Sequence, residues 1–221
     1  RDAWYFEGKA AQDARTKDIL SITVKANASG LAEARVIKQR LPGITLGLLR
    51  SEFDFANIQP LTWEKVKEYI QTFAAVMGEV CGFRYDRRAD KVSVAQGALE
   101  GFKYLRLDPA GRQLARWLVQ AAIEEAASGK KAALMWPMVD SQGDVDYILG
   151  VQQEVQAQCR QDGAAWAGKE LEFGAMVETT GAVEIVEYLL EHFDFLSVGT
   201  NDLFEAVSGI SRDADLSSMD E

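Results

Sequence analysis

The sequence has few cysteines, few histidines and no long apolar run, and each shortage excludes a class of protein. Its 221 residues include two cysteines, Cys81 and Cys159, and one histidine, His192. Two cysteines are too few for a disulfide framework and fit a reducing compartment, so a cytoplasmic location is predicted. One histidine excludes a metal centre built from several imidazoles. No stretch reaches the roughly 18 uninterrupted apolar residues of a membrane span, and the charged start is unlike a signal peptide, so no membrane partner is expected.

Positive charge is also scarce relative to negative charge. There are 24 lysines and arginines against 34 aspartates and glutamates, which gives a formal net charge of −10. Nucleic acid is therefore not an expected partner, because its phosphates require a basic face. An anionic small molecule remains compatible, since a few local arginines and a metal ion can overcome a negative global field. Apolar residues make up 48% of the chain, which is enough for a substantial core.

Short apolar segments alternate with longer amphipathic segments along the chain. Residues 1–20 are predicted to form a lead-in helix or linker, and residues 21–221 a single domain. The predicted strands are 22–26, 44–49, 80–85, 132–136, 171–177 and one that begins at Phe195. The predicted helices are 32–40, 63–78, 110–127, 143–161 and 182–191. This alternation predicts an α/β fold made of βαβ units with a parallel sheet.

Polar residues follow several of the predicted strands. They are Asn27, Arg50, Glu178, Asn201 and Asp202. In a closed (β/α) barrel the carboxyl ends of the strands share one face, whereas in an open sheet they spread along an edge. Contributions from the first, second, fifth and sixth strands to one site favour the barrel. No G-x-G-x-x-G turn follows the first strand, which disfavours a dinucleotide-binding fold.

The types of these residues indicate a site for a phosphorylated ligand. Glu178 and Asp202 are hard oxygen donors that suit Mg²⁺, which takes its remaining ligands from water and substrate oxygens. Arg50 and Arg212 could hold a phosphate, although Arg50 could instead pair with a neighbouring acid, Glu52 or Asp54. Such a site would stabilise the charge that moves in phosphoryl transfer. From loop chemistry alone, Asn201 and Asp202 could equally be polar residues of the turn expected after the last strand.

Three ordered segments carry a resemblance to a known family. They are GLLRSEF at Gly47–Phe53, MVETTGA at Met176–Ala182 and SVGTNDL at Ser197–Leu203. With LMWPMV at Leu134–Val139, they resemble the phosphoenolpyruvate-utilising enzymes, most closely enzyme I of the bacterial sugar phosphotransferase system. Pyruvate phosphate dikinase and phosphoenolpyruvate synthase are relatives within that family. The resemblance implies a (β/α)8 TIM-type barrel.

The resemblance also implies an activity, a cofactor and partners. The family's barrel binds phosphoenolpyruvate with Mg²⁺, and the phosphoryl group passes to a histidine on a separate domain or carrier protein. Carried over by motif, Glu178 and Asp202 are implied as metal ligands. Arg50, Asn201, Asp202 and Arg212 are implied as substrate contacts, and a homodimer is implied as the assembly.

Arg84 is a further candidate substrate contact, but its register departs from the family pattern. The family places an arginine three residues before an aspartate, and with Asp86 aligned that position holds Phe83. Strict alternation along a strand would point Arg84 to the face opposite the site. A β-bulge would bring it back. Lys103 and Arg106 fall on a second family pair of basic residues, or else form an ordinary exposed face.

Two strands of the family's barrel have no counterpart in this sequence. The seventh strand carries a cysteine that protonates the product enolate, and neither Cys81 nor Cys159 lies in that context. No catalytic residue is therefore predicted, and an incomplete barrel of about six βα units is expected. Three hypotheses stay open: the barrel of a phosphoenolpyruvate-dependent protein phosphotransferase, the barrel of a dikinase or synthase, or a degenerate domain that binds a ligand or partner without catalysis.

Overall fold

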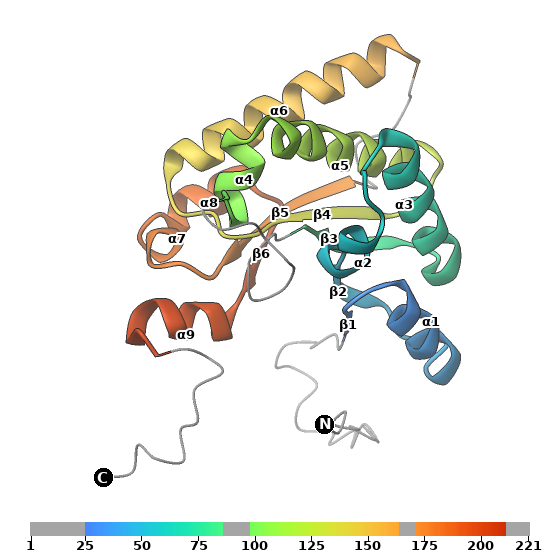
Figure 1. The fold of residues 1–221 in the computed structure, drawn as a ribbon, viewed down its shortest axis with the longest axis horizontal. Helices are drawn as coiled ribbons and strands as arrows, with labels where there is room; N and C mark the ends of the chain where they lie inside the picture. Colours follow the sequence, from blue (N-terminus) through green and yellow to red (C-terminus); the bar gives the residue numbers. More distant parts are fainter. Residues whose placement is uncertain (1–24, 86–97, 164–170, 211–221) are drawn as a thin grey trace, which may run out of the picture.

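The computed structural model of the chain describes residues 25–85, 98–163 and 171–210, and these form a curled parallel sheet with helices on its convex side (Figure 1). Six strands pair in chain order, from the first to the last. They are β1 (Ala26–Ala28), β2 (Leu46–Arg50), β3 (Val80–Arg84), β4 (Ala132–Trp136), β5 (Leu171–Val177) and β6 (Phe195–Val198). All five pairings are parallel. The predicted α/β fold with an incomplete TIM-type barrel is confirmed.

The helices follow the strands as a parallel sheet requires. They are α1 (Leu31–Arg40), α2 (Glu52–Asn57), α3 (Trp63–Met77), α4 (Gly101–Leu107), α5 (Pro109–Ala127), α6 (Gln142–Gln161), α7 (Thr180–Glu184), α8 (Val186–His192) and α9 (Thr200–Ser208). The long ones begin at residues typical of helix starts. Thr62 caps α3 by accepting a hydrogen bond from the Lys65 amide, and Asp108 caps α5 ahead of Pro109. None of the helices in the described ranges is long and apolar enough to cross a membrane.

The two faces of the sheet carry different apolar clusters. Outward residues such as Leu49, Phe83 and Leu134 are buried in the main core, under the helices. Inward residues form a smaller cluster of Leu48, Met135 and Met176, against which Phe195 packs. Since side chains on both faces of β2, β4 and β5 are buried, these strands are almost continuously apolar, which is why their positions could be predicted from sequence.

Several predicted boundaries differ from the structure. The first strand is Ala26–Ala28 and includes Asn27, whereas the prediction was 22–26; Lys25 lies before the strand, and residues 22–24 lie outside the described residues. The predicted helix 182–191 is two helices, α7 and α8, which meet at Ile185. The turn expected after the last strand is wrong: Asn201 and Asp202 lie in the first turn of α9. An acid in a first turn is stabilised by the helix dipole, so the same residue types suited either structure. The lead-in expected over residues 1–20 lies outside the described residues.

Candidate functional site

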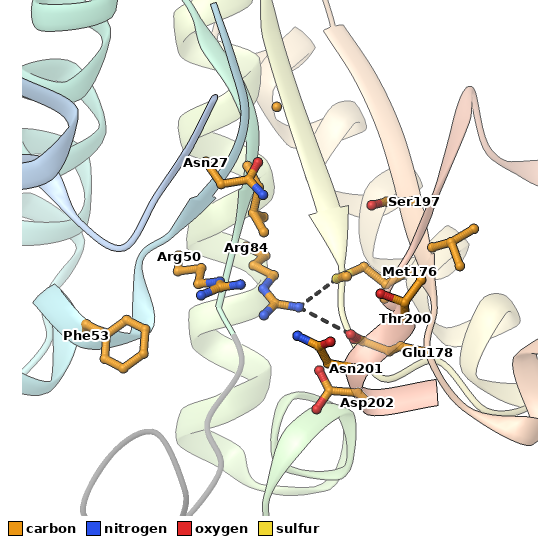
Figure 2. Close-up of a pocket in the computed structure, with 14 residues that line it drawn as sticks. Asn27, Arg50, Phe53, Arg84, Met176, Glu178, Ser197, Thr200, Asn201 and Asp202 are labelled. Atoms are coloured by element: carbon orange, nitrogen blue, oxygen red, sulfur yellow. Dashed lines mark hydrogen bonds and ion pairs between the residues drawn. The ribbon is translucent and has the colours of Figure 1, made fainter. Parts of the chain in front are cut away.

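A cavity of about 360 Å³ lies at the carboxyl ends of the strands (Figure 2). Its walls come from β1, β2, β3, β5, β6 and the start of α9, so one face of the curled sheet supplies the whole site. The polar and charged residues that line it are Asn27, Arg50, Arg84, Glu178, Ser197, Thr200, Asn201 and Asp202. Five of the predicted site residues are among them. The sixth, Arg212, lies outside the described residues.

Arg84 reaches the cavity because β3 contains a bulge. Val80 pairs with Ala132 and Phe83 pairs with Leu134, so three steps along β3 match two steps along β4. The extra residue reverses the alternation, which turns Phe83 outward into the core and Arg84 inward. Arg84 is then the direct cross-strand partner of Arg50. The sequence analysis required a β-bulge to turn Arg84 toward the site, and the structure contains that bulge.

Arg84 is held by contacts on its backbone and on its side chain. Its carbonyl oxygen accepts hydrogen bonds from the Ser51 amide at 3.0 Å and from the Ser51 hydroxyl at 2.6 Å. Its Nη1 donates to Glu178 Oε2 at 3.4 Å and contacts Met176 Sδ at 2.6 Å, as Figure 2 shows. The residue is 2% exposed. A buried guanidinium requires such partners, because an unpaired buried charge costs several kcal/mol.

Glu178 is fixed just as firmly. It is fully buried, and its Oε1 accepts a hydrogen bond of 2.8 Å from the Met138 amide. Within the described ranges Met138 is the one residue other than glycine with a positive φ, at 54°. Such a conformation costs about 1–3 kcal/mol and persists where the surroundings impose it. The loop after β4 thus holds a strained backbone that directs an N–H group at the carboxylate.

Gly199 allows the last strand and α9 to approach Glu178. A Cβ atom at position 199 would lie 2.6 Å from Glu178 Oε2 and 2.7 Å from Glu178 Cβ. Only glycine fits this contact without movement of the backbone. The glycine in the SVGTNDL segment therefore places Asn201 and Asp202 beside Glu178, and Figure 2 shows these side chains next to one another.

The arginines of the cavity retain unused hydrogen-bonding capacity. Arg50 Nε and Arg84 Nε are buried and donate to no other atom of the described residues. Leaving a buried donor unpaired costs about 1–3 kcal/mol. Two adjacent guanidinium groups with spare donors form a geometry that suits a phosphate or carboxylate ligand. Asp54, considered from sequence as a partner of Arg50, instead accepts hydrogen bonds from the Leu31 amide and the Tyr69 hydroxyl.

The carboxylates of the cavity suit a hard divalent cation. The described residues contain no cluster of three or more acidic, histidine or cysteine side chains arranged to hold a metal ion. Glu178 and Asp202 nevertheless line the same cavity. Two carboxylates without further protein ligands suit Mg²⁺, which keeps several waters and shares substrate oxygens. The donor set therefore fits a magnesium ion bound together with an anionic ligand.

The second pair of basic residues lies elsewhere. Lys103 and Arg106 are on α4 and line a separate cavity of about 880 Å³. Arg106 Nη1 is 2.6 Å from Asp144 Oδ1, near the start of α6. Lys103 is exposed. Both residues are thus separate from the cavity at the strand ends, so the structure does not bring this second basic pair of the family pattern into the site.

Sequence reasoning left Glu52 out of the site. Its side chain is fully buried and its Oε1 lies 3.9 Å from Arg84 Nη2. The available signal was its position within the GLLRSEF segment, two residues after Arg50. The sequence indicates Glu52 only as an alternative partner of Arg50.

The fold and the cavity together define a class: a TIM-type half-barrel with guanidinium groups and carboxylates at its strand ends. Residues 6–219 match the family described as "PEP-utilising enzyme, PEP-binding domain". This match covers almost the whole chain, and the chain belongs to that family. The resemblance noted from the three segments is thereby confirmed.

Individual relatives agree with this assignment. The chain is 27% identical to a phosphoenolpyruvate-protein phosphotransferase of Haemophilus influenzae, over 76% of the chain and 30% of the relative. It is 29% identical to a multiphosphoryl transfer protein of Rhodobacter capsulatus, over 90% of the chain and 24% of the relative. It is 28% identical to a phosphoenolpyruvate-protein phosphotransferase of Cupriavidus necator, over 89% of the chain and 35% of the relative. The chain thus spans about a quarter to a third of the length of these relatives.

Proposed function

We propose that this chain is the phosphoenolpyruvate- and Mg²⁺-binding barrel of a phosphoenolpyruvate-dependent protein phosphotransferase. The observation that carries the proposal is the convergence of Arg50, Arg84, Glu178 and Asp202, from the ends of β2, β3 and β5 and the start of α9, on one cavity. Two of these residues are cations suited to a phosphate and two are anions suited to a metal. Family membership and the names of the relatives support a site for phosphoenolpyruvate.

In this proposal the arginines hold the phosphoryl group. Arg50 and Arg84 are cross-strand neighbours, so their guanidinium groups present donors to one anion from the same side. Asn201 adds an amide at the opposite wall, and Arg212 completes the set by resemblance. Donors fixed before the ligand arrives stabilise the charge that develops during transfer without further reorganisation.

Glu178 and Asp202 would hold Mg²⁺, since both line the cavity. When bound, the ion would neutralise charge on the oxygens of the carboxylate and phosphoryl groups. In the structure Arg84 and Glu178 neutralise one another across 3.4 Å. When phosphoenolpyruvate and Mg²⁺ bind, Arg84 would pair with the anion and Glu178 with the cation. Each buried charge would therefore keep a partner of opposite sign.

The phosphoryl group would pass to a histidine on another domain or on a carrier protein. The bond between phosphorus and the enol oxygen breaks, a phosphorus–nitrogen bond to the histidine forms, and pyruvate enolate leaves to take up a proton. The described residues around the cavity include no cysteine or histidine. We therefore assign the proton donor to a segment outside them.

The exposed apolar surface at the last strand supports a further segment at this position. Val198 on β6 is 62% exposed and Val207 on α9 is 71% exposed, with Phe204 also exposed nearby. No residue of α9 is buried. We propose that additional strands cover β6 and α9 and close the barrel. A homodimer is proposed from the resemblance alone, and sedimentation velocity tests it.

Calorimetric titration tests the function. The folded chain should bind phosphoenolpyruvate with Mg²⁺ present, with a dissociation constant between about 1 μM and 1 mM, as is common for enzyme substrates. Asp202→Asn should abolish the dependence on Mg²⁺. The matched control is Asp162→Asn, a surface carboxylate bonded to Gln158 at the end of α6. A folded protein with no Mg²⁺-dependent binding would refute the proposal.

A further inference from the structure

Arg84 lies between two buried carboxylates rather than beside one. Its Nη1 is 3.4 Å from Glu178 Oε2, and its Nη2 is 3.9 Å from Glu52 Oε1. Both glutamate side chains are fully buried. The planar fork of a guanidinium lets its two ends interact with different carboxylates at once. Arg84 is therefore shared between Glu52 and Glu178.

Glu52 is a restrained partner of Arg84. It is the first residue of α2, directly after Ser51, which bonds to the Arg84 carbonyl oxygen. The helix itself is anchored on two sides. Phe55 is buried in the core, and Asp54 accepts hydrogen bonds from the Leu31 amide at 2.7 Å and from the Tyr69 hydroxyl at 2.8 Å. The anchored α2 and the full burial of the Glu52 side chain limit how far its carboxylate can follow Arg84.

We infer that Glu52 is a positioning residue that restrains Arg84 from closing fully on Glu178, and so keeps Glu178 available to a divalent cation. This inference rests on the proposed function, because it gives Glu178 a cation to bind. If Glu52 is neutralised, Glu178 becomes the one remaining carboxylate of the described residues near Arg84. The guanidinium then moves toward Glu178, and a cation must displace it to bind.

Two simpler roles for Glu52 predict different results. A purely structural counter-ion affects unfolding but leaves the Mg²⁺ requirement of ligand binding unchanged. A general field effect weakens cation binding through lost negative charge, and it depends on charge alone. Positioning depends on both the charge and the reach of the side chain. The variants Glu52→Gln and Glu52→Asp separate these possibilities, since only the first removes the charge.

The test measures the Mg²⁺ concentration that gives half-maximal phosphoenolpyruvate binding, by calorimetry on the full chain. Glu52→Gln should raise it by about fivefold, within the range of coupling between residues of one ion-pair network. Glu52→Asp, which keeps the charge but withdraws it from Arg84 by one methylene, should raise it by about twofold or more on the same basis. Glu125→Gln is the matched control, because Glu125 is also a buried glutamate, paired with Lys130 away from the cavity.

The outcomes are distinguishable. An unchanged Mg²⁺ requirement in Glu52→Gln overturns the inference and leaves the proposed function intact. A rise in Glu52→Gln with none in Glu52→Asp assigns the effect to charge alone and also overturns it. If Glu52→Gln does not fold, the Mg²⁺ requirement of Glu52→Asp tests the inference alone, and an unchanged requirement overturns it. A folded wild-type chain without Mg²⁺-dependent binding overturns the proposed function and this inference together.

Discussion

Gly199 offers the most direct test of how tightly the site is assembled. A Cβ atom there would lie 2.6 Å from Glu178 Oε2, which is about 0.8 Å short of the 3.4 Å of an ordinary contact. Glu178 cannot withdraw, because it is fully buried and bonded to the Met138 amide. The substitution Gly199→Ala must therefore push the start of α9, with Asn201 and Asp202, away from Glu178.

Both stability and ligand binding should respond to this displacement. Overpacking of this kind costs about 1–3 kcal/mol in free energy of unfolding. A shift approaching 1 Å between groups that act on one ligand can cost about 100-fold in function. We expect Mg²⁺-dependent phosphoenolpyruvate binding to weaken by about tenfold or more, and urea unfolding and calorimetry measure the two effects separately.

A second glycine serves as the control. Gly150 lies within α6, and a Cβ there would meet nothing within 4 Å. Gly150→Ala should stabilise the protein by about 0.5–1 kcal/mol, because alanine loses less backbone entropy in a helix. It should leave ligand binding unchanged. If Gly199→Ala bound ligand and Mg²⁺ like the wild type at undiminished stability, the fixed geometry argued for Glu178 and α9 would be wrong.

Three further predictions address the charges and the core. Arg84→Met should lower the free energy of unfolding by about 3–5 kcal/mol, since it leaves buried carboxylates without their cation; a loss below about 1 kcal/mol in urea unfolding would contradict this. Phe55→Ala should cost about 3–5 kcal/mol, because the ring is fully buried where α2 meets the core, and the same assay measures it. Burial and the hydrogen bond to Asp54 raise the pKa of Tyr69, so its contribution to stability is complete below about pH 10 and is lost as the pH rises further. Tyr69→Phe should reduce the fall in the urea midpoint between about pH 9 and pH 11, and an unchanged slope would refute the assignment.

The strands could be predicted from sequence because their burial does not depend on exact pairing. β4 and β5 are short apolar runs in the middle of the sheet, where such a run is buried whichever way its side chains point. The strands lie in the sheet in the same order as along the chain, because consecutive βαβ units pair with one another. The convergence of Arg50, Glu178 and Asp202 followed from the same reasoning, because the carboxyl ends of the strands share one face.

Features that depend on non-local packing were harder to predict. The sequence predicts a turn at the first residues of α9, because asparagine and aspartate suit both a turn and the first turn of a helix. The break between α7 and α8 at Ile185 has no proline or glycine to announce it. Glu52 was missed as part of the site, since its proximity to Arg84 depends on the pairing of β2 with β3.

The two bulges explain why the arginines share one cavity. In β2, Leu46 and Leu48 face successive residues of β1, so the extra residue is Gly47. In β3 the extra residue lies between Val80 and Phe83, a stretch that contains Gly82. A glycine inside a strand often marks a bulge, and bulges near functional sites re-aim side chains. Since both bulges precede the last two residues of their strands, Arg50 and Arg84 are turned inward together and remain in register. A single bulge would have placed one guanidinium in the cavity and the other in the apolar core.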